Sequence, residues 1–289
     1  MPAFDSASPA PDSSQFGVSS GHEYDPLFAG SADAPPPDRH FGRVGQVPWT
    51  LSQTIVGTAV TLVPWVTVLV ATQLTAPPSA ANTKPLARNV DIASGIIFFI
   101  FTAVVESAFL VAPLYIALAR RPPGMTRRQG LFALGLRPTP LVAALGWVVV
   151  GLAMIVAATF LYQWVIQVLH LPLQTNADAL AKRAKLEPFT VLGALAGAVL
   201  VAPICEEIFF RGFAFAGFLR GMSVWPAVTL SALLFGISHG DIGSLAPLIV
   251  FGAVVAIVRW RTGSIWPGVV IHATNNLIAA LAIVAVLTQ

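Results

Sequence analysis

The sequence predicts an all-α fold, a polytopic bundle of about seven transmembrane helices. Of its 289 residues, 56% are hydrophobic and only 10% are charged, and the mean hydropathy is +0.77. A soluble globular domain has about 25% charged residues. Several apolar runs also reach the roughly 20 residues needed to cross a bilayer. Because lipid offers the backbone no hydrogen bonds, each such run must be a helix.

The apolar runs divide the chain into three parts. Residues 1–44 form an N-terminal tail rich in Pro, Ser, Ala and Asp, a composition typical of disorder, and the tail lacks the pattern of a signal peptide. Residues 45–188 hold the first three helices and their loops, and residues 189–289 hold the core helices that carry most of the buried polar residues. The expected spans are 49–74, 92–119, 141–170, 189–219, 224–240, 244–260 and 265–287.

The charges are distributed in a way that predicts orientation. The tail holds six acids and two bases, net −4, whereas the remaining residues hold seven acids and fourteen bases, net +7. These bases lie mainly in short loops, where they set topology and do not form a nucleic-acid surface. Placing the N-terminus in the cytosol puts eleven arginines inside, against five bases outside (Lys84, Arg88, Lys182, Arg183 and Lys185). The eleven are Arg39, Arg43, Arg120, Arg121, Arg127, Arg128, Arg137, Arg211, Arg220, Arg259 and Arg261.

Few ionisable residues lie inside the expected spans, and each is costly in hydrocarbon unless paired or hydrated. The stretch APICEEIFFRGF contains three of them. Glu207 and Arg211 are four residues apart, so they lie on one helix face and form an expected ion pair. Glu206 is rotated by about 100° from Glu207 and has no such partner, which suits a general base. Pro203 removes a helical hydrogen bond and is expected to bend the helix before the pair.

Two later spans carry a histidine each. FGISHG places Phe235 four residues before His239, and HATNN places His272 four residues before Asn276. A lone histidine in a span is more often a packed, hydrogen-bonded residue than a catalyst. Counted at 1.5 Å per residue from one membrane face, however, Glu206 and His239 lie ~21 Å deep, His272 ~12 Å and Asn276 ~18 Å. These depths predict a single polar cluster in the bundle.

The three motifs together resemble those of the CPBP family, the CAAX prenyl endopeptidases and their bacterial relatives linked to bacteriocin processing and self-immunity. The family is marked by EExxxR, FxxxH and HxxxN on successive core helices, and the similarity covers about residues 189–287. It implies an intramembrane endopeptidase. Eukaryotic prenyl-protein enzymes of the family have eight spans, so an eighth stays open here. The matching residues are Glu206, Glu207 and Arg211, then Phe235 and His239, then His272 and Asn276.

The resemblance and the residue chemistry together assign roles. Amide hydrolysis needs an activated water, an acid for the leaving amine and donors for the oxyanion. Glu206 is the expected base and His239 helps to hold the water, while His272 and Asn276 stabilise the oxyanion or help to bind a metal. Glu207 and Arg211 fix the helix, supported by Phe235. Two histidines and a carboxylate (Glu206, His239 and His272) could hold a catalytic zinc ion. The sequence has no HExxH motif, so the need for a divalent metal stays open.

Other functions remain open. Cys205 adjoins Glu206, but a buried thiol in apolar surroundings is inert, which disfavours a cysteine protease. Membrane carboxylates and histidines also serve transporters and proton relays, although the repeats common in transporters are not evident. A non-catalytic immunity or scaffold protein of the same fold is a third alternative. Glu106, mid-span and outside the motifs, is interpreted as a neutral buried acid, a partner of Arg211 or part of a hydrated cavity.

The expected partners are the lipid bilayer and a protein or peptide substrate, membrane-anchored or lipidated, with no nucleic acid. The abundance of Ala, Arg and Pro favours a high-GC bacterium. We therefore expect an integral protein of the bacterial cytoplasmic membrane.

Overall fold

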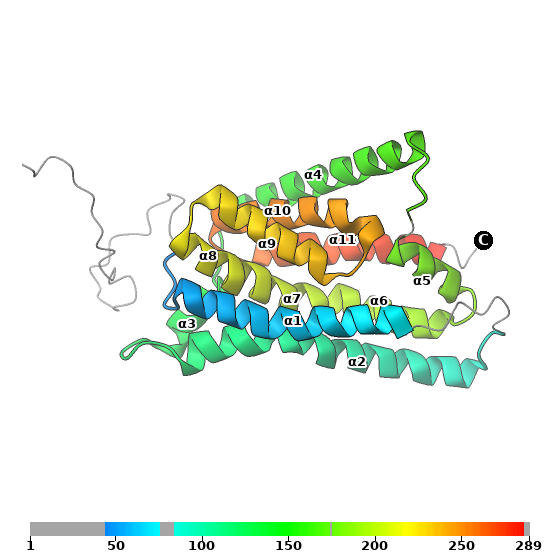
Figure 1. The fold of residues 1–289 in the computed structure, drawn as a ribbon, viewed down its shortest axis with the longest axis horizontal. Coiled ribbons are helices and arrows are strands. Elements are labelled where there is room, and N and C mark those ends of the chain that lie inside the picture. Colours follow the sequence, from blue (N-terminus) through cyan, green and yellow to red (C-terminus); the bar gives the residue numbers. More distant parts are fainter. Residues whose placement is uncertain (1–43, 76–83, 174, 286–289) are drawn as a thin grey trace, which may run out of the picture. The chain divides into compact units, whose positions relative to one another are not determined.

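The computed structural model describes residues 44–75, 84–173 and 175–285, which all belong to one compact unit, Arg39–Gln289. The predicted tail lies almost wholly outside the described residues. Within them the structure is helical throughout, and it contains no strand (Figure 1). The all-α prediction is confirmed.

The helices have the following bounds in chain order. The first half contains α1 (Leu51–Thr75), α2 (Arg88–Leu114), the π-helix η3 (Tyr115–Ala119), α3 (Arg127–Ala133), α4 (Leu141–Val168) and α5 (Asn176–Ala184). The second half contains α6 (Pro188–Leu200), α7 (Ala202–Glu206), the π-helix η4 (Glu207–Ala214), α8 (Phe215–Gly221), α9 (Val224–Ser238), the 3₁₀ helix η5 (Ile242–Ser244), α10 (Leu245–Thr262) and α11 (Trp266–Ala285).

Six helical segments among the described residues are long and apolar enough to cross a membrane, and the seventh expected span is shorter. That shorter helix is α9, with 15 residues, or about 22 Å at 1.5 Å per residue. It is buried on one side against α10, which is why it need not match the full bilayer thickness by itself. The chain is an integral membrane protein.

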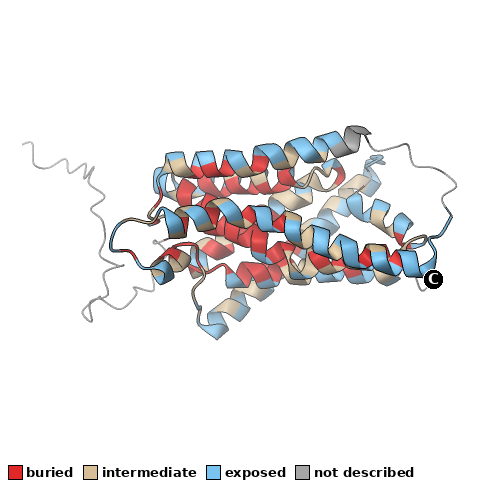
Figure 2. Cartoon of the chain, turned by 90° about the horizontal axis from the view of Figure 1, so that it is seen from below, coloured by how far each residue is buried: buried red, intermediate tan, exposed pale blue. Residues whose placement is uncertain are grey.

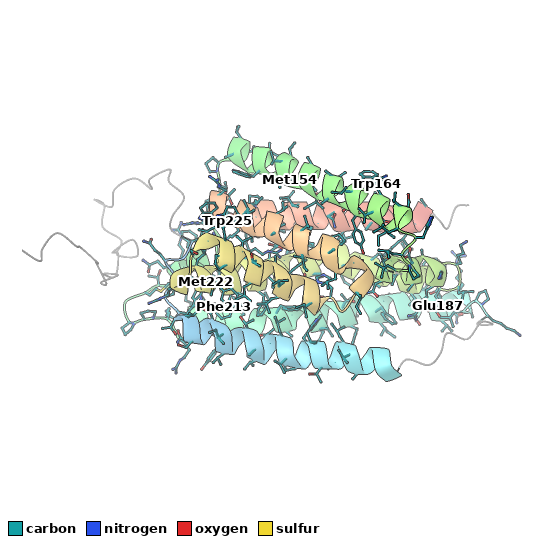
Figure 3. The ribbon with its side chains drawn as sticks, turned by 45° about the horizontal axis from the view of Figure 1, so that its top comes forward. Met154, Trp164, Glu187, Phe213, Met222 and Trp225 are labelled. Carbon is teal, nitrogen blue, oxygen red and sulfur yellow. The ribbon has the colours of Figure 1, made fainter. Side chains whose placement is uncertain are left out.

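The bundle is organised around α6 to α11. Helix α2 packs along α6, α9 packs on α10, and α4 covers α10 and α11 from outside (Figure 1). Buried residues concentrate between the helices, while the outer faces are exposed (Figure 2). Met154 and Trp164 of α4, 50% and 60% exposed, lie on this outer surface (Figure 3). Lipid chains cover such apolar faces in a membrane.

Glycines let α2 and α6 approach closely. A Cβ atom on Gly193 would lie 1.9 Å from the carbonyl oxygen of Gly95, a distance that no side chain tolerates. The first turn of α6 is also bonded to α2, because the Asp91 carboxylate accepts hydrogen bonds from the backbone N–H groups of Phe189 and Thr190 at 3.0 and 2.8 Å. Glycine contacts of this kind drive helix packing where the hydrophobic effect cannot.

The long fourth span is interrupted where the sequence predicts a bend. Helix α6 ends at Leu200, and α7 begins at Ala202 with Pro203 in its first turn. The chain then widens into the π-helix η4, which starts at Glu207. Single π-helical turns are frequent at functional sites. The break and the π-helix together set the direction in which the two glutamates point.

The two ends of the bundle differ in charge. Met222 and Trp225 lie at one end and Glu187 at the other (Figure 3). We call the first the basic end, because its described residues include Arg120, Arg121, Arg127, Arg128, Arg137, Arg220, Arg259 and Arg261 but no acid. Two of the arginines counted towards this end, Arg211 and Arg259, are buried within helices, at 0% and 2% exposure.

Candidate active site

Glu206 and His239 face each other across the bundle. Glu206 is the last residue of α7, and His239 directly follows α9. The Glu206 Oε2 atom lies 3.9 Å from the His239 Nε2 atom, and the side chains are 9% and 29% exposed. The end of α9 is held in place by α1, because the Trp65 indole donates a hydrogen bond to the Ser238 carbonyl at 2.8 Å. Two chain segments 33 residues apart thus meet at one polar point.

The geometry of His239 determines which nitrogen faces the glutamate. Its Nδ1 atom lies 2.8 Å from the Phe235 carbonyl oxygen, which can only accept, so Nδ1 carries a proton. In the neutral ring Nε2 is then an acceptor directed at Glu206. A separation of 3.9 Å is too long for a direct hydrogen bond. A water about 2.8 Å from both atoms would bridge them at an angle of about 90°, near that of its two O–H bonds.

Glu207 is fully buried and has two partners. Its Oε1 atom accepts a hydrogen bond from Arg211 Nη1 at 2.7 Å, so the ion pair expected from the four-residue spacing is present. The same oxygen lies 3.2 Å from His272 Nδ1. Arg211 Nη2 also donates to the carbonyl of Gly252 in α10, at 3.3 Å. Glu207 therefore links η4 to α11 directly, and to α10 through Arg211.

The link between Glu207 and His272 is a contact that spacing along one helix does not reveal. A carboxylate paired with arginine only accepts hydrogen bonds, so His272 Nδ1 donates to it. This fixes the orientation of the ring and leaves Nε2 as its second polar atom. A carboxylate that orients a histidine in this way is a recurrent device in both metal and hydrolase sites. Glu207 was predicted to fix its own helix. Its contact with His272 means that it also positions α11.

Phe235 is the aromatic centre of the site. Its ring centroid lies 4.6 Å from that of His239 and 5.7 Å from that of His272, and the Arg211 guanidinium carbon lies 4.4 Å from it. Phe251 stacks on Phe235, with centroids 5.4 Å apart, and also contacts His272, with centroids 4.9 Å apart. Aromatic faces attract a cation and restrict the rotation of the imidazole rings. Phe235 therefore spaces both histidines relative to Arg211.

Asn276 is bonded to the helix break. Its Nδ2 atom donates to the carbonyl oxygen of Ala198 at 2.8 Å, two residues before α6 ends. The neighbouring carbonyl, that of Val199, lacks its helical partner because Pro203 has no N–H group to donate. Asn276 thus uses one amide hydrogen to stabilise the interruption that positions Glu206, and it keeps a second one.

Glu106, which lies outside the motifs, is close to this site. It is 9% exposed, on the face of α2 that packs against α7 and η4, and it interacts electrostatically with Glu206. The Oε2 atoms of both glutamates are buried without a hydrogen-bond partner. Cys205, also buried, interacts with both. The interaction with Glu206 disfavours the alternative in which Glu106 is a partner of Arg211.

The predicted cluster therefore forms in part as expected. Glu206, Glu207, Arg211, His239 and His272 are joined by direct or electrostatic contacts, and Asn276 lies one helical turn from His272. The sequence did not indicate that His272 contacts Glu207, or that Glu106 adjoins Glu206. For Glu106, the sequence indicated only that an acid lies in the middle of an expected span.

The described residues do not fit a three-ligand zinc site. A catalytic zinc ion takes three protein ligands and one open position. No group of three His, Cys, Asp or Glu side chains within the described part of the chain is arranged to hold a metal ion. We derive no chemical step through a metal.

The fold and the site define a class of protein, a polytopic membrane protein with a buried carboxylate–histidine centre. Residues 188–278 match the family model described as type II CAAX prenyl endopeptidase Rce1-like. This segment is similar to the CAAX endopeptidase or CPBP family, and all seven motif residues lie within it. The resemblance seen in the sequence is confirmed.

A curated relative agrees with this assignment. The chain is 32% identical over 77 residues to the "Putative membrane peptidase YdiL" of Bacillus subtilis (strain 168). The matched stretch covers 27% of this chain and 32% of that protein, so the chain spans about a third of the length of the relative. No solved structure matches the chain.

Proposed function

We propose that this protein is an intramembrane endopeptidase that hydrolyses a peptide bond with a water activated by Glu206. The observation that carries the proposal is the pair formed by Glu206 Oε2 and His239 Nε2, 3.9 Å apart in a mostly buried site. This gap accepts one water and directs both of its hydrogens to acceptors. Such an arrangement raises the nucleophilicity of the water oxygen.

The reaction follows from the positions of the remaining groups. The water oxygen attacks the peptide carbonyl while its proton passes to Glu206. The charge that develops on the carbonyl oxygen would be met by donors from α11, His272 Nε2–H and the second amide hydrogen of Asn276. To donate from Nε2 while Nδ1 donates to Glu207, His272 must carry both protons, and the adjacent carboxylate offsets that charge. Glu206 then returns its proton to the leaving amine as the C–N bond breaks.

The first test replaces the candidate base. Glu206→Gln keeps the size of the side chain but cannot take a proton, so we expect cleavage to fall by about 10²–10⁴-fold. The measurement is comparative peptidomics of membrane proteins in cells that carry either form, followed by cleavage of an identified peptide in proteoliposomes. Glu187→Gln is the matched control, because Glu187 is bonded to Arg183 at the other end of the bundle.

The outcome of that test is decisive in both directions. Cleavage that persists in the Glu206→Gln protein contradicts the mechanism, and loss of cleavage in the Glu187→Gln protein would reveal a nonspecific effect. Purified protein should also be assayed for bound metal and for sensitivity to chelators. Stoichiometric metal together with chelator-sensitive cleavage would contradict a water activated by Glu206 and His239 alone.

A proton relay is the second candidate function, and one observation favours it. Two buried carboxyls, Glu106 and Glu206, interact electrostatically within the bundle, and each has an oxygen without a hydrogen-bond partner. Proton pathways use such pairs. A proteoliposome flux assay separates the two functions. Proton movement without cleavage, abolished by Glu106→Gln, would favour the relay.

The proposed substrate is a protein or peptide that is membrane-anchored or lipidated, since the site is enclosed by transmembrane helices. We further propose that the protein resides in the bacterial cytoplasmic membrane with the basic end in the cytosol, as the arginine distribution favours. Single cysteines introduced at Arg127 and at Lys182, in a Cys205→Ser background, would be labelled from opposite sides by an impermeant reagent. Labelling of Arg127→Cys from the periplasmic side would reverse the orientation.

A further inference from the structure

The turn between α9 and α10, residues 239–244, carries one half of the pair that faces the candidate water. Helix α9 ends at Ser238, and Gly240 then adopts φ of +60°, a left-handed conformation that lets the chain turn. Irregular backbone at membrane depth needs partners inside the protein. The contacts that hold this turn therefore also set the separation between His239 and Glu206.

Asp241 is the polar centre of the turn. Its Oδ1 atom accepts a hydrogen bond from the backbone N–H of Ser244 at 3.2 Å, which caps the 3₁₀ helix η5. Its Oδ2 atom accepts one from the backbone N–H of Asn176, the first residue of α5, at 2.9 Å. A carboxylate is favourable at the N-terminal end of a helix, where the backbone dipoles are positive. The Asp241 carboxylate also interacts electrostatically with His239.

Helix α4 contacts the same turn. The Tyr162 hydroxyl donates a hydrogen bond to the Gly243 carbonyl, and Tyr162 interacts electrostatically with Asp241. Together with the bond from Trp65 to the Ser238 carbonyl, three helices hold the end of α9 and the turn after it. Asp241 and Tyr162 lie outside the three sequence motifs, so the mechanism proposed above assigns them no role.

The other end of α5 is packed against the opposite half of the site. Ala184 is completely buried in an apolar cluster with Val191 and Leu195 of α6 and Ala280 and Ile283 of α11. Helices α6 and α11 are the two that the side-chain bond at the helix break joins. Helix α5 has nine residues, about 14 Å at 1.5 Å per residue. It therefore connects the α9–α10 turn to the helices on the other side of the site (Figure 1).

We propose that Asp241 is a positioning residue for His239, acting through its bond to α5. The proposal rests on the proposed peptidase function, since it concerns the water between His239 Nε2 and Glu206 Oε2. Their separation of 3.9 Å admits one water, and a displacement of 1 Å in such a geometry can lower a rate by about 10²-fold. Asp241 touches neither the water nor the peptide in this scheme. Its loss should therefore lower kcat and leave KM unchanged.

The first measurement is the cleavage of an identified peptide in proteoliposomes. Asp241→Ala removes both hydrogen bonds, and we expect kcat to fall by about 10–100-fold at unchanged KM. Asp241→Asn keeps one acceptor oxygen, and Tyr162→Phe removes only the bond from α4, so both should lose less. Glu187→Gln is the matched control, because Glu187 is bonded to Arg183 near the other end of α5 and should retain the wild-type kcat.

The second measurement reports the position of the turn without peptidase activity. Ile242 in the turn and Leu200 at the end of α6 are 80% and 61% exposed, so both positions accept a nitroxide label. The labels are attached to Ile242→Cys and Leu200→Cys in a Cys205→Ser background. The distribution of distances between the two labels should be narrow when Asp241 is present, and broader or shifted in Asp241→Ala.

The two measurements separate failure of this proposal from failure of the proposed function. An unchanged kcat and an unchanged distance distribution in Asp241→Ala overturn the positioning role, even where cleavage depends on Glu206. A raised KM at constant kcat also overturns it, since Asp241 would then act in substrate binding. A wild type that cleaves nothing contradicts the peptidase function, and a distance distribution altered by Asp241→Ala would still support the role in holding the turn. If Asp241→Ala does not fold, Asp241→Asn replaces it in both measurements, and wild-type values in both contradict the proposal.

Discussion

Arg211 at the centre of the bundle and Arg259 at the basic end are both almost completely buried, yet their surroundings are opposite. Arg211 has the Glu207 carboxylate at 2.7 Å, the Gly252 carbonyl at 3.3 Å and the Phe235 ring at 4.4 Å. Arg259 has a second arginine as its electrostatic neighbour and two unbonded nitrogens. The same side chain is thus compensated internally in one region, whereas in the other no counter-charge meets it within the part of the chain that the structure describes.

The difference shows how position in the membrane determines what a charge requires. At mid-depth no outside group can reach a guanidinium, so its partners must come from the protein itself. At the headgroup level lipid phosphates are available, and a protein can leave the counter-charge to the membrane. The central arginine therefore belongs to the construction of the site.

The largest expected effect comes from breaking the central pair. Arg211→Met leaves Glu207 as a buried carboxylate beside His272, and we expect it to destabilise the protein by about 3–5 kcal/mol. Removing both partners in Arg211→Met/Glu207→Leu should cost less than Arg211→Met alone, because no unpaired charge remains. Unfolding in a mild detergent, followed by circular dichroism, measures both.

The matched comparison is Arg259→Met under the same conditions, which should not destabilise the protein in zwitterionic detergent. Equal losses for Arg211→Met and Arg259→Met would mean that the two arginines are compensated alike. If the double variant were less stable than Arg211→Met, the ion pair would stabilise the protein by more than the penalty of one unpaired buried charge.

Much of this contrast could be predicted from the sequence for the central region. The spacing of Glu207 and Arg211 gave their pairing, because residues four apart share a helix face. Pro203 gave the break, because proline cannot donate the helical hydrogen bond. Hydropathy gave the spans, with the exception that α9 is too short to match the bilayer on its own.

The contacts between helices could not be predicted in the same way. The carboxylate that His272 contacts depends on how α11 is rotated against η4. The π-helical turn alters that rotation, and residue spacing in an ideal α-helix does not predict by how much. Asn276 was expected at an oxyanion, and its observed bond to Ala198 depends on where α6 ends. Arg259 lies near the end of an expected span, where arginines commonly snorkel into the headgroups, and spacing along the chain does not reveal that Gly135 closes over it.

A smaller effect is expected from the loop that covers Arg259. Gly135 has φ of +81°, a left-handed conformation that costs other residues about 1–2 kcal/mol, and an added Cβ would also press on the guanidinium. Gly135→Ala should therefore lower stability, and it should lower it less in an Arg259→Ala background, where the space is open. Equal losses in both backgrounds would assign the whole effect to the backbone. The midpoint of thermal unfolding in phosphatidylcholine nanodiscs gives both values.

The smallest effect concerns a charge at the opposite end, in water. Asp178 accepts hydrogen bonds from the backbone N–H and the hydroxyl of Thr175, at 2.8 and 2.9 Å, and these bonds hold its pKa below the usual value. A lowered pKa means that the stabilisation of α5 is present above the unfolded pKa of about 3.9 and is lost as the pH falls through the folded value. Because the pair is exposed, we expect only about 0.5 kcal/mol. Hydrogen exchange of the α5 amides, corrected for intrinsic rates between pH 5 and pH 3, should lose protection in the wild type and stay flat in Asp178→Asn. Equal pH dependence in the two proteins would show that the exposed Asp178 cap adds nothing to the stability of α5.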